Sequence, residues 1–284
     1  MGPCFFILFI NDLCNIVKTS TIKLYADDVT IYHTVNNDSD YQRFVADLLA
    51  IEHWANMWQM KINIEKCKVL HFGKRNLCKC YFLNNIQIVN SSCEKILGVY
   101  VDTECKFKQH IFGIVKKARK TCGIILKAFQ GSSIEVMISL YNTYVRCLLE
   151  YANVVFCPHH VYLSNLLENV QRFYTKRLPG LWYTDYNTRL IICKLDSLEC
   201  RRNRADLLMV YKILHNECHS CIKDFLIIQN SITRGHSMKL FKVHSRLDVR
   251  KYFFVNRVVD DWNLLDNSVV SCTNVKYFMN SISY

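Results

Sequence analysis

Two short runs of strand-forming residues, three residues apart, constrain the amino-terminal part of the chain more than any other feature. "IKLY" at 22–25 and "VTIY" at 29–32 enclose Ala26, Asp27 and Asp28. Runs of β-branched and aromatic residues joined by so short a connection predict a β-hairpin. Two adjacent carboxylates would lie at its tip, where Asp is a common turn residue. An ordinary surface turn and a functional pair of anions both fit this placement.

A helix is predicted directly after the hairpin, with Asp38 or Ser39 as its N-cap. Apolar residues then recur at spacings of three and four, as one helical face requires: Tyr41, Phe44, Leu48, Ile51, Ala55 and Trp58. This stripe predicts that Trp54 and Trp58 are core residues and not platforms for base stacking. Strand-like residues return in "KINIEKCKVLHFG" from 61 and in "KILGVYVD" at 95–102. Residues 1–105 are therefore predicted to form an α+β unit.

The next segment, 106–180, is predicted to be a small helical domain. Residues 106–127 contain seven Lys or Arg and no acid, with apolar residues at helical spacing. Ser132 and Glu135 form a capping-box pattern ahead of a second helix. A third helix, from about Leu163, is expected to end before Pro179 and Gly180.

Residues 181–284 carry weaker signals. Helices are expected near 199–216 and 251–265, with the basic segment "TRGHSMKLFKVH" at 233–244 extended between them. Cys218, His219 and Cys221, with His215, form a dense group of potential metal ligands. Without a second ligand pair at zinc spacing, this group does not favour a zinc site.

Charge is distributed unevenly along the chain, which carries a formal net charge of +12 and has a pI near 9.0. Residues 1–60 have three Lys or Arg against seven Asp or Glu, a net of −4, which leaves +16 on residues 61–284. This asymmetry favours a polyanionic partner, most plausibly nucleic acid, although a membrane surface or a ribosome would attract the same charge.

The 15 cysteines do not indicate a disulfide framework, because their number is odd, their spacing is irregular and no cleavable signal is recognised. The apolar run "CFFILFI" at 4–10 is too short to span a membrane and lacks a basic flank. We expect an intracellular protein, in the nucleus or the cytoplasm, that is not secreted and has no membrane partner.

Several segments occur in an order that resembles one polymerase family. "GPCFFILFINDL" at 2–13, "LYADD" at 24–28, "WANMWQMKINIEKCKVLHFG" at 54–73 and "LGVYVD" at 97–102 resemble the reverse transcriptase of non-LTR retrotransposons, the jockey-like LINE elements. Later segments, including "LENVQRFYTKRLPGL" and "VVDDWNLL", resemble those that follow the polymerase core. The chain thus looks like the C-terminal part of an RNA-directed DNA polymerase.

The resemblance implies a partial polymerase palm at 1–105, built as an antiparallel sheet with a packing helix. It implies a helical thumb at 106–180 and a mostly helical C-terminal extension at 181–284. The reaction would be nucleotidyl transfer, in which Mg²⁺ or Mn²⁺ ions activate the primer 3′-hydroxyl and stabilise the leaving pyrophosphate. The partners would be an RNA template, a DNA primer and deoxynucleoside triphosphates.

Individual roles follow from the matching motifs. Asp27 and Asp28 would be the catalytic metal ligands, and Tyr25 and Ala26 would line the primer terminus. Lys66 would meet the departing pyrophosphate, with a solvated strand-end lysine as the alternative. Gly98 would touch the primer backbone, with a plain strand bend as the alternative.

Basic residues would hold the template–primer duplex. Five belong to the first thumb helix and three are further candidates for backbone contacts: Lys116, Lys117, Arg119, Lys120 and Lys127, then Arg172, Lys176 and Arg177. A run of charges is usually a solvated face, but the lack of compensating acids on this helix favours a phosphate-binding role.

The chain also departs from the family pattern, because "MGPCFF" resembles only the end of a longer segment. The fingers and an upstream palm aspartate that shares the metals have no counterpart. We therefore expect a very poor polymerase with an exposed sheet edge and marginal solubility. Whether the chain is an enzyme stays open. The alternatives are a non-catalytic nucleic-acid-binding remnant that uses thumb and extension, and a basic helical protein without a nucleic-acid role.

Overall fold

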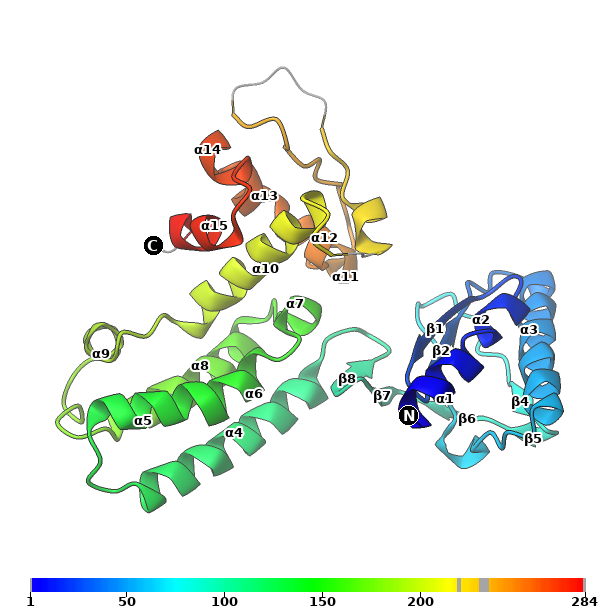
Figure 1. Cartoon of the computed structure of the whole chain (residues 1–284), viewed down its shortest axis with the longest axis horizontal. Helices are drawn as coiled ribbons and strands as arrows, with labels where there is room; N and C mark the ends of the chain where they lie inside the picture. Colours follow the sequence, from blue (N-terminus) through cyan, green and yellow to red (C-terminus); the bar gives the residue numbers. More distant parts are fainter. Residues whose placement is uncertain (1, 219–220, 230–234, 283–284) are drawn as a thin grey trace. The chain divides into compact units, whose positions relative to one another are not determined.

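The computed structural model describes residues 2–218, 221–229 and 235–282 of the chain. Helices and small two-stranded sheets together give a mixed α and β architecture, as predicted (Figure 1). The chain divides into two compact units, residues 1–96 with 101–104 and residues 97–100 with 105–284. Within the described ranges, no helix combines the length and the apolar character that crossing a membrane requires.

The first unit begins with helices and a hairpin. Its leading elements are α1 (Gly2–Ile10), α2 (Leu13–Ile16), β1 (Thr21–Tyr25), β2 (Asp28–Tyr32) and α3 (Asp38–Met57). The predicted hairpin is therefore confirmed. The apolar run near the amino terminus forms α1, which buries Ile10 but leaves Phe5 and Leu8 63% and 73% exposed.

Helix α3 supplies the core face on which the hairpin rests. Leu48, Ile51, Trp54 and Ala55 are buried, as the apolar stripe predicted. The N-cap is Asn37, whose side chain accepts a hydrogen bond from the Asp40 N–H at 2.9 Å, so the predicted start was one or two residues late.

The prediction that Trp58 is a core residue was wrong. Trp58 follows the last residue of α3, and its side chain is 45% exposed. The indole still meets the Phe9 ring edge-on, with 4.9 Å between the ring centroids. Apolar residues at helical spacing do not reveal where the helix and its core contacts end. The burial of the last residue in such a series is therefore the hardest to predict.

The rest of the first unit consists of short strands. They are β3 (Lys68–Leu70), β4 (Phe82–Leu83), β5 (Ile86–Gln87), β6 (Val89–Ser91), β7 (Cys93–Ile96) and the second half of β8 (Val99–Asp102). The first two residues of β8 belong to the second unit. The described strands pair only two by two, and the β3–β6 pair is parallel. The single antiparallel sheet expected for residues 1–105 was therefore wrong. "KILGVYVD" is not one strand, because Leu97 and Gly98 have φ of +46° and +89° and turn the chain between β7 and β8. Two left-handed residues in succession are typical of hairpin turns.

The second unit is helical. Its first part contains α4 (Lys108–Ala128), α5 (Ile134–Tyr141), a π-helical segment η2 (Asn142–Arg146), α6 (Cys147–Glu150), α7 (Asn153–Phe156), α8 (Val161–Lys176), α9 (Tyr186–Cys193) and α10 (Leu198–Leu214). Helix α4 packs along α5, α6 and α8 (Figure 1). The N-cap of α5 is Ser133 and not Ser132, so Glu135 lies too close to it for the predicted capping box. Sequence analysis missed α9.

Short elements complete the second unit: η3 (Cys221–Phe225), α11 (Asp248–Lys251), α12 (Phe254–Arg257), α13 (Val259–Asn263), α14 (Asn267–Val270) and α15 (Val275–Ser281). Tyr211, Trp262 and Phe278 are fully buried in the core that these helices share with α10. Of the predicted extended segment, 233–234 lie outside the described residues. The remainder forms no regular strand, apart from an isolated bridge between Ile228 and Leu240.

The single helix predicted near 251–265 was wrong, because α11, α12 and α13 interrupt it. Side chains donate hydrogen bonds to backbone carbonyls that would accept from backbone N–H groups in a continuous helix. The Asn256 amide donates to the Arg250 carbonyl at 3.0 Å, and the Arg257 guanidinium donates to the Tyr252 carbonyl at 3.3 Å. Such side-chain bonds compete directly with helix formation.

Candidate nucleic-acid and metal-binding sites

The hairpin places its two carboxylates at an exposed tip. β1 and β2 pair antiparallel, with Tyr25 directly opposite Asp28, so Ala26 and Asp27 alone form the turn. Ala26 has φ +52°, and Asp28 is already the first residue of β2. All four side chains are exposed. The structure thus brings Tyr25, Ala26, Asp27 and Asp28 together, as predicted.

The strand register gives the hairpin one covered and one open face. Ile22, Leu24 and Ile31 pack against the core formed with α1, α2 and α3. Cross-strand partners share a face, so Asp28 lies beside Tyr25 on the opposite, exposed face. The open face therefore presents a carboxylate and a phenol close to the turn that carries Asp27.

Asp47, on α3, anchors the segment that enters the hairpin. Its carboxylate accepts hydrogen bonds from the backbone N–H groups of Lys18, Thr19 and Ser20 at 3.0, 3.1 and 2.7 Å. It also accepts from the hydroxyls of Thr19 and Ser20 at 2.6 and 2.7 Å. Ser20 directly precedes β1. Asp47 thus fixes the point at which the hairpin begins.

The Asp47 carboxyl has a strongly perturbed pKa. Burial alone would raise it, but the hydrogen bonds from Thr19, Lys18 and Ser20 lower it to about 2. Sequence analysis missed this residue, although a signal was present. Asp47 lies four residues before Ile51 and seven before Trp54, on the helix face that the stripe assigns to the core.

Divalent metal binding at the hairpin depends on the donors that it offers. Carboxylate oxygens are the ligands that Mg²⁺ prefers, so Asp27 and Asp28 have the right chemistry. However, no group of three or more His, Cys, Asp or Glu side chains placed to hold a metal occurs among the described residues. Two carboxylates do not complete a site for two ions that share ligands.

The possible zinc ligands gain no support from the structure. His215 is engaged in the core of the second unit, where its Nε2 lies 2.9 Å from the Val270 carbonyl oxygen and its ring stacks on Tyr211. His219 lies outside the described residues. The cysteines that the structure describes form no disulfide.

Lys66 and Gly98 occupy well-defined local positions. Lys66 ends the 3₁₀ turn η1 (Ile64–Lys66) and is exposed. Gly98 lies in the β7–β8 turn, where an added Cβ would come within 3.2 Å of Tyr151 Cε1. Tyr151 donates a hydrogen bond to the Leu97 carbonyl at 2.8 Å, which fixes the ring against the turn. The fold alone thus explains why position 98 is a glycine, and its contact with a primer stays a prediction.

The predicted basic residues lie on α4 and at the end of α8, and all are exposed. We call the set the basic surface: Lys116, Lys117, Arg119, Lys120, Lys127, Arg172, Lys176 and Arg177. Lys116, Lys120 and Lys127 follow the face of α4 opposite its buried residues, Ala118 and Cys122 among them. None of the eight forms an ion pair with another residue that the structure describes.

An aromatic ring joins the two parts of the basic surface. The guanidinium carbons of Arg119 on α4 and Arg177 after α8 lie 5.7 and 3.7 Å from the centroid of the Phe173 ring. Lys176 lies over Trp182 at 5.1 Å. These cation–π contacts hold positive charges of two helices close together while leaving them exposed.

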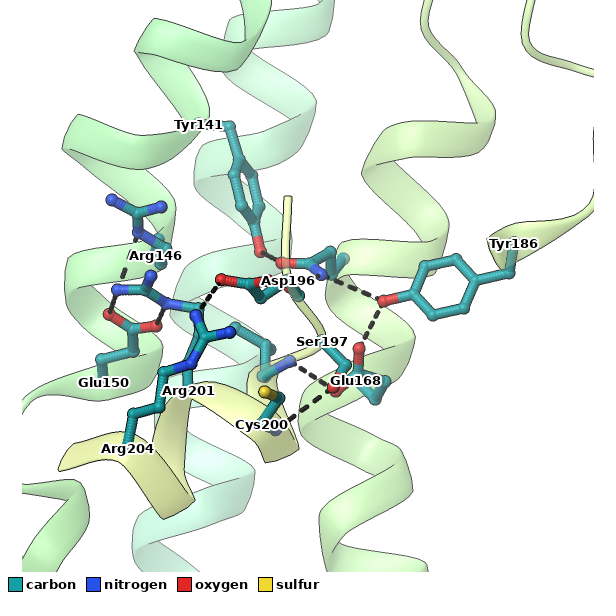
Figure 2. A network of polar contacts seen from close by, with 12 residues as sticks. Tyr141, Arg146, Glu150, Glu168, Tyr186, Asp196, Ser197, Cys200, Arg201 and Arg204 are labelled. Atoms are coloured by element: carbon teal, nitrogen blue, oxygen red, sulfur yellow. Dashed lines mark hydrogen bonds and ion pairs between the residues drawn. The ribbon is translucent and has the colours of Figure 1, made fainter. Parts of the chain in front are cut away.

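Buried acids of the second unit belong to structural networks (Figure 2). Tyr186 and the Leu198 N–H donate to the two oxygens of Glu168, the latter at 3.0 Å. Gln171 accepts from Tyr141 at 2.8 Å and donates to Tyr186 at 3.1 Å. Because both Glu168 oxygens have donors, this carboxylate serves the packing of α8, α9 and α10 and is not a catalytic candidate.

An ion pair links α10 to α12. Arg257 binds both oxygens of Asp206, at 2.7 and 2.8 Å. Burial raises the pKa of the Asp206 carboxyl, although the Arg257 guanidinium opposes the shift. A bidentate geometry of this kind is typical of a structural arginine–carboxylate pair.

Comparison with known proteins decides the family. Residues 1–108, which contain the hairpin, match the family described as reverse transcriptase (RNA-dependent DNA polymerase). An uncharacterized protein of Caenorhabditis elegans is 30% identical over 138 residues, which are 48% of this chain and 69% of that protein. The chain belongs to the reverse transcriptase family.

A relative from a mobile element agrees with this assignment. The RNA-directed DNA polymerase from mobile element jockey of Drosophila melanogaster is 28% identical over 131 residues, or 42% of this reverse transcriptase chain. The alignment spans only 14% of the jockey polymerase. No solved structure matches. The predicted relation to the reverse transcriptases of non-LTR retrotransposons is confirmed.

Proposed function

We propose that this chain takes part in RNA-directed DNA synthesis as palm and thumb of a non-LTR retrotransposon reverse transcriptase. Asp27 and Asp28 contribute carboxylates to the divalent metals, with an RNA template, a DNA primer and deoxynucleoside triphosphates as partners. One observation carries the proposal: adjacent, exposed carboxylates lie at the tip of a hairpin that Asp47 and α3 anchor, in a chain of this family.

In the proposed arrangement, the residues of the chain have distinct tasks. A bound Mg²⁺ or Mn²⁺ pair would supply charge stabilisation for the reacting phosphate. Tyr25 and Ala26 support the primer end beside the hairpin tip, Lys66 offsets charge on the departing pyrophosphate, and Gly98 approaches the primer backbone. The basic surface holds the phosphates of the template–primer duplex. Such a protein acts inside the cell, in the nucleus or cytoplasm.

We further propose that the chain alone is a very poor polymerase. The hairpin offers two carboxylates, and the described residues place no third metal-binding side chain with them. Nucleotidyl transfer by two metals depends on accurate ion positions, so a missing ligand removes most of the rate enhancement. The second candidate function is non-catalytic binding of nucleic acid, which the exposed basic surface favours.

The first test measures metal binding at the hairpin. Mn²⁺ binding to the full chain, followed by electron paramagnetic resonance, should weaken at least tenfold in Asp27→Asn/Asp28→Asn, because both charges that attract the ion are removed. Asp266→Asn is the control for loss of a single carboxylate charge, since Asp266 is exposed and its side chain makes no capping bond. Equal Mn²⁺ affinity in the hairpin variant and the wild type would contradict the proposed metal site.

Primer extension distinguishes the two candidate functions. The polymerase proposal expects slow, Mg²⁺-dependent extension on an RNA template, which Asp27→Asn abolishes and Asp266→Asn preserves. Template–primer binding without any extension, at equal affinity in all three proteins, would favour the non-catalytic alternative.

A further inference from the structure

The C-terminal part of the second unit contains a hollow of about 340 Å³. We call it the basic pocket, after its lining residues: Lys242, Val243, His244, Ser245, Lys251 and Asn256. They come from the segment before α11, from the end of α11 and from α12. The volume lies within the range of about 300–1,000 Å³ that is typical of ligand sites.

The charge of the lining favours an anion. Lys242, His244 and Lys251 contribute basic groups, and the lining contains no Asp or Glu. Lys242 forms an ion pair with Asp260, but this pair is exposed and so holds the lysine only weakly. A second hollow, of about 370 Å³, has the acids Glu199 and Asp261 and the base Arg204 in its lining and offers no such preference.

Asn256 builds the pocket wall. Asn256 is 1% exposed, and its Nδ2 lies 3.2, 3.0 and 3.0 Å from the Val243 carbonyl, the Ser245 Oγ and the Arg250 carbonyl, three acceptors that its two N–H groups share. Three acceptors around this nitrogen fix the orientation of the amide. The pocket shape is thus set before a ligand arrives.

The same amide leaves an unused acceptor. Asn256 Oδ1 has no hydrogen-bond partner among the described residues, but this atom is itself fully buried, so a ligand in the pocket does not reach it. The cations of the lining therefore decide the kind of ligand, and they match a phosphate group.

Exposed aromatic residues are sequence neighbours of the two pocket lysines. Phe241 and Phe253 are 50% and 40% exposed and stand next to Lys242 and near Lys251 in the sequence. The Arg250 guanidinium carbon lies 5.7 Å from the centroid of the Phe253 ring. Cations interleaved with exposed rings are typical of surfaces that bind single-stranded nucleic acid, where bases stack on the rings.

We propose that the basic pocket binds a backbone phosphate of a single-stranded nucleic acid. This inference rests on the proposed function. It assigns to the C-terminal extension a contact with single-stranded nucleic acid, separate from the contact of the basic surface with the duplex. Lys242 and Lys251 neutralise the phosphate, and the rings beside them accept the neighbouring bases.

The test is the salt dependence of binding of the full chain to a short, unstructured, labelled RNA, measured by fluorescence anisotropy. Each phosphate neutralised on a single strand contributes about 0.7 to the slope of log affinity against log salt concentration. Lys242→Ala/Lys251→Ala should therefore reduce the slope by about 0.7, because the two lysines together neutralise one phosphate. Asp260→Asn should tighten binding, since it releases Lys242.

Lys74→Ala/Lys276→Ala is the matched control, because it removes the same charge from exposed lysines that do not line the pocket. The control should leave the slope within error of the wild type. Equal slopes for the pocket variant and the control would overturn the inference. Far-ultraviolet circular dichroism of each variant verifies that the fold is kept.

Two further outcomes separate this inference from the proposed function. The basic-surface variant is Lys116→Gln/Lys120→Gln/Lys127→Gln. If it loses duplex affinity while the pocket variant binds RNA like the control, only the pocket inference fails. If the pocket variant weakens RNA binding while the basic-surface variant binds duplex normally, the pocket stands and the proposed duplex contact fails. Inorganic phosphate could instead raise the melting temperature of the wild type but not of the pocket variant, while both proteins bind RNA equally. That result would identify the ligand as free phosphate and overturn the proposed contact with single-stranded nucleic acid.

Discussion

At the scale of the residue, Asp47 shows how one buried carboxylate can position a site that it does not enter. Three consecutive residues before β1 direct N–H or hydroxyl groups at its two oxygens. A neutral side chain at this position would leave several of those donors weakly satisfied. The hairpin tip would then lose its fixed starting point.

Asp47→Asn tests this role through local stability. We expect a loss of about 2 kcal/mol in the free energy of unfolding of the first unit, the size typical of hydrogen bonds to charged groups. Amide hydrogen exchange of Lys18, Thr19 and Ser20, measured by nuclear magnetic resonance, should accelerate most. Unchanged exchange at these three amides would contradict the anchoring role.

The same variant has a defined pH signature. Because the folded-state pKa of Asp47 is depressed to about 2, its stabilisation is fully present above the unfolded value of about 3.9 and is lost as pH falls toward 2. Wild type should therefore lose stability between about pH 4 and pH 2. The stability difference between wild type and Asp47→Asn should shrink over the same interval.

At the scale of the element, α4 combines two roles on opposite sides. One side is buried against α5, α6 and α8, and the other carries lysines without a nearby acid on the same helix. Contacts of Arg119 and Arg177 with Phe173 extend this charge to α8. The element is thus a rigid support for cations, suited to a phosphate backbone.

Lys116→Gln/Lys120→Gln/Lys127→Gln tests the element. If each lysine neutralises one duplex phosphate, the slope of log affinity against log salt concentration should fall by about 2.7, at about 0.9 for each contact. Lys68→Gln/Lys74→Gln/Lys276→Gln removes the same charge elsewhere and should leave the slope unchanged. A similar loss in both triple variants would indicate a general charge effect.

Local signals in the sequence predicted the elements well where periodicity was sustained. The hairpin, α3, α4, α8 and α10 all follow from strand-forming runs or from apolar spacing. The interruption near residue 252 could not be predicted, because it depends on Asn256 and Arg257 reaching carbonyls of the preceding residues. Caps shifted by one residue for a similar reason, since neighbouring Asn and Ser residues compete for the same role.

The candidate sites were harder to predict from the sequence than the helices and strands. The adjacent Asp27 and Asp28 are visible in the sequence, and so is the basic run of α4. The basic pocket joins residues from three short segments, so no single motif marks it. Asp47 was detectable as an acid on an apolar face, but its partners 27–29 residues earlier were not.

At the scale of the whole molecule, the chain contains two compact units with separate cores. Leu48 and Trp54 belong to cores of the first unit, and Tyr211 and Trp262 to a core of the second. Each unit thus has its own apolar interior. Independent cores favour separate unfolding transitions.

Calorimetry of two cavity-forming variants tests this independence. Leu163→Ala removes a side chain that is 0% exposed in the second unit, and should cost that unit about 2–5 kcal/mol. Leu48→Ala is the counterpart in the first unit. Each substitution should lower the melting temperature of only one transition, and a single transition that shifts in both variants would contradict the prediction.

The two-residue turn of the hairpin also limits how this motif can vary. Side chains of a strand alternate between faces, so inserting or deleting one residue between Tyr25 and Asp28 would turn over every side chain of β2. Ile31 would then face solvent, and Thr30 and Tyr32 would face the core. Ala26 has φ +52°, so Gly or Asn could replace it without added backbone strain, whereas a change of length would not be tolerated.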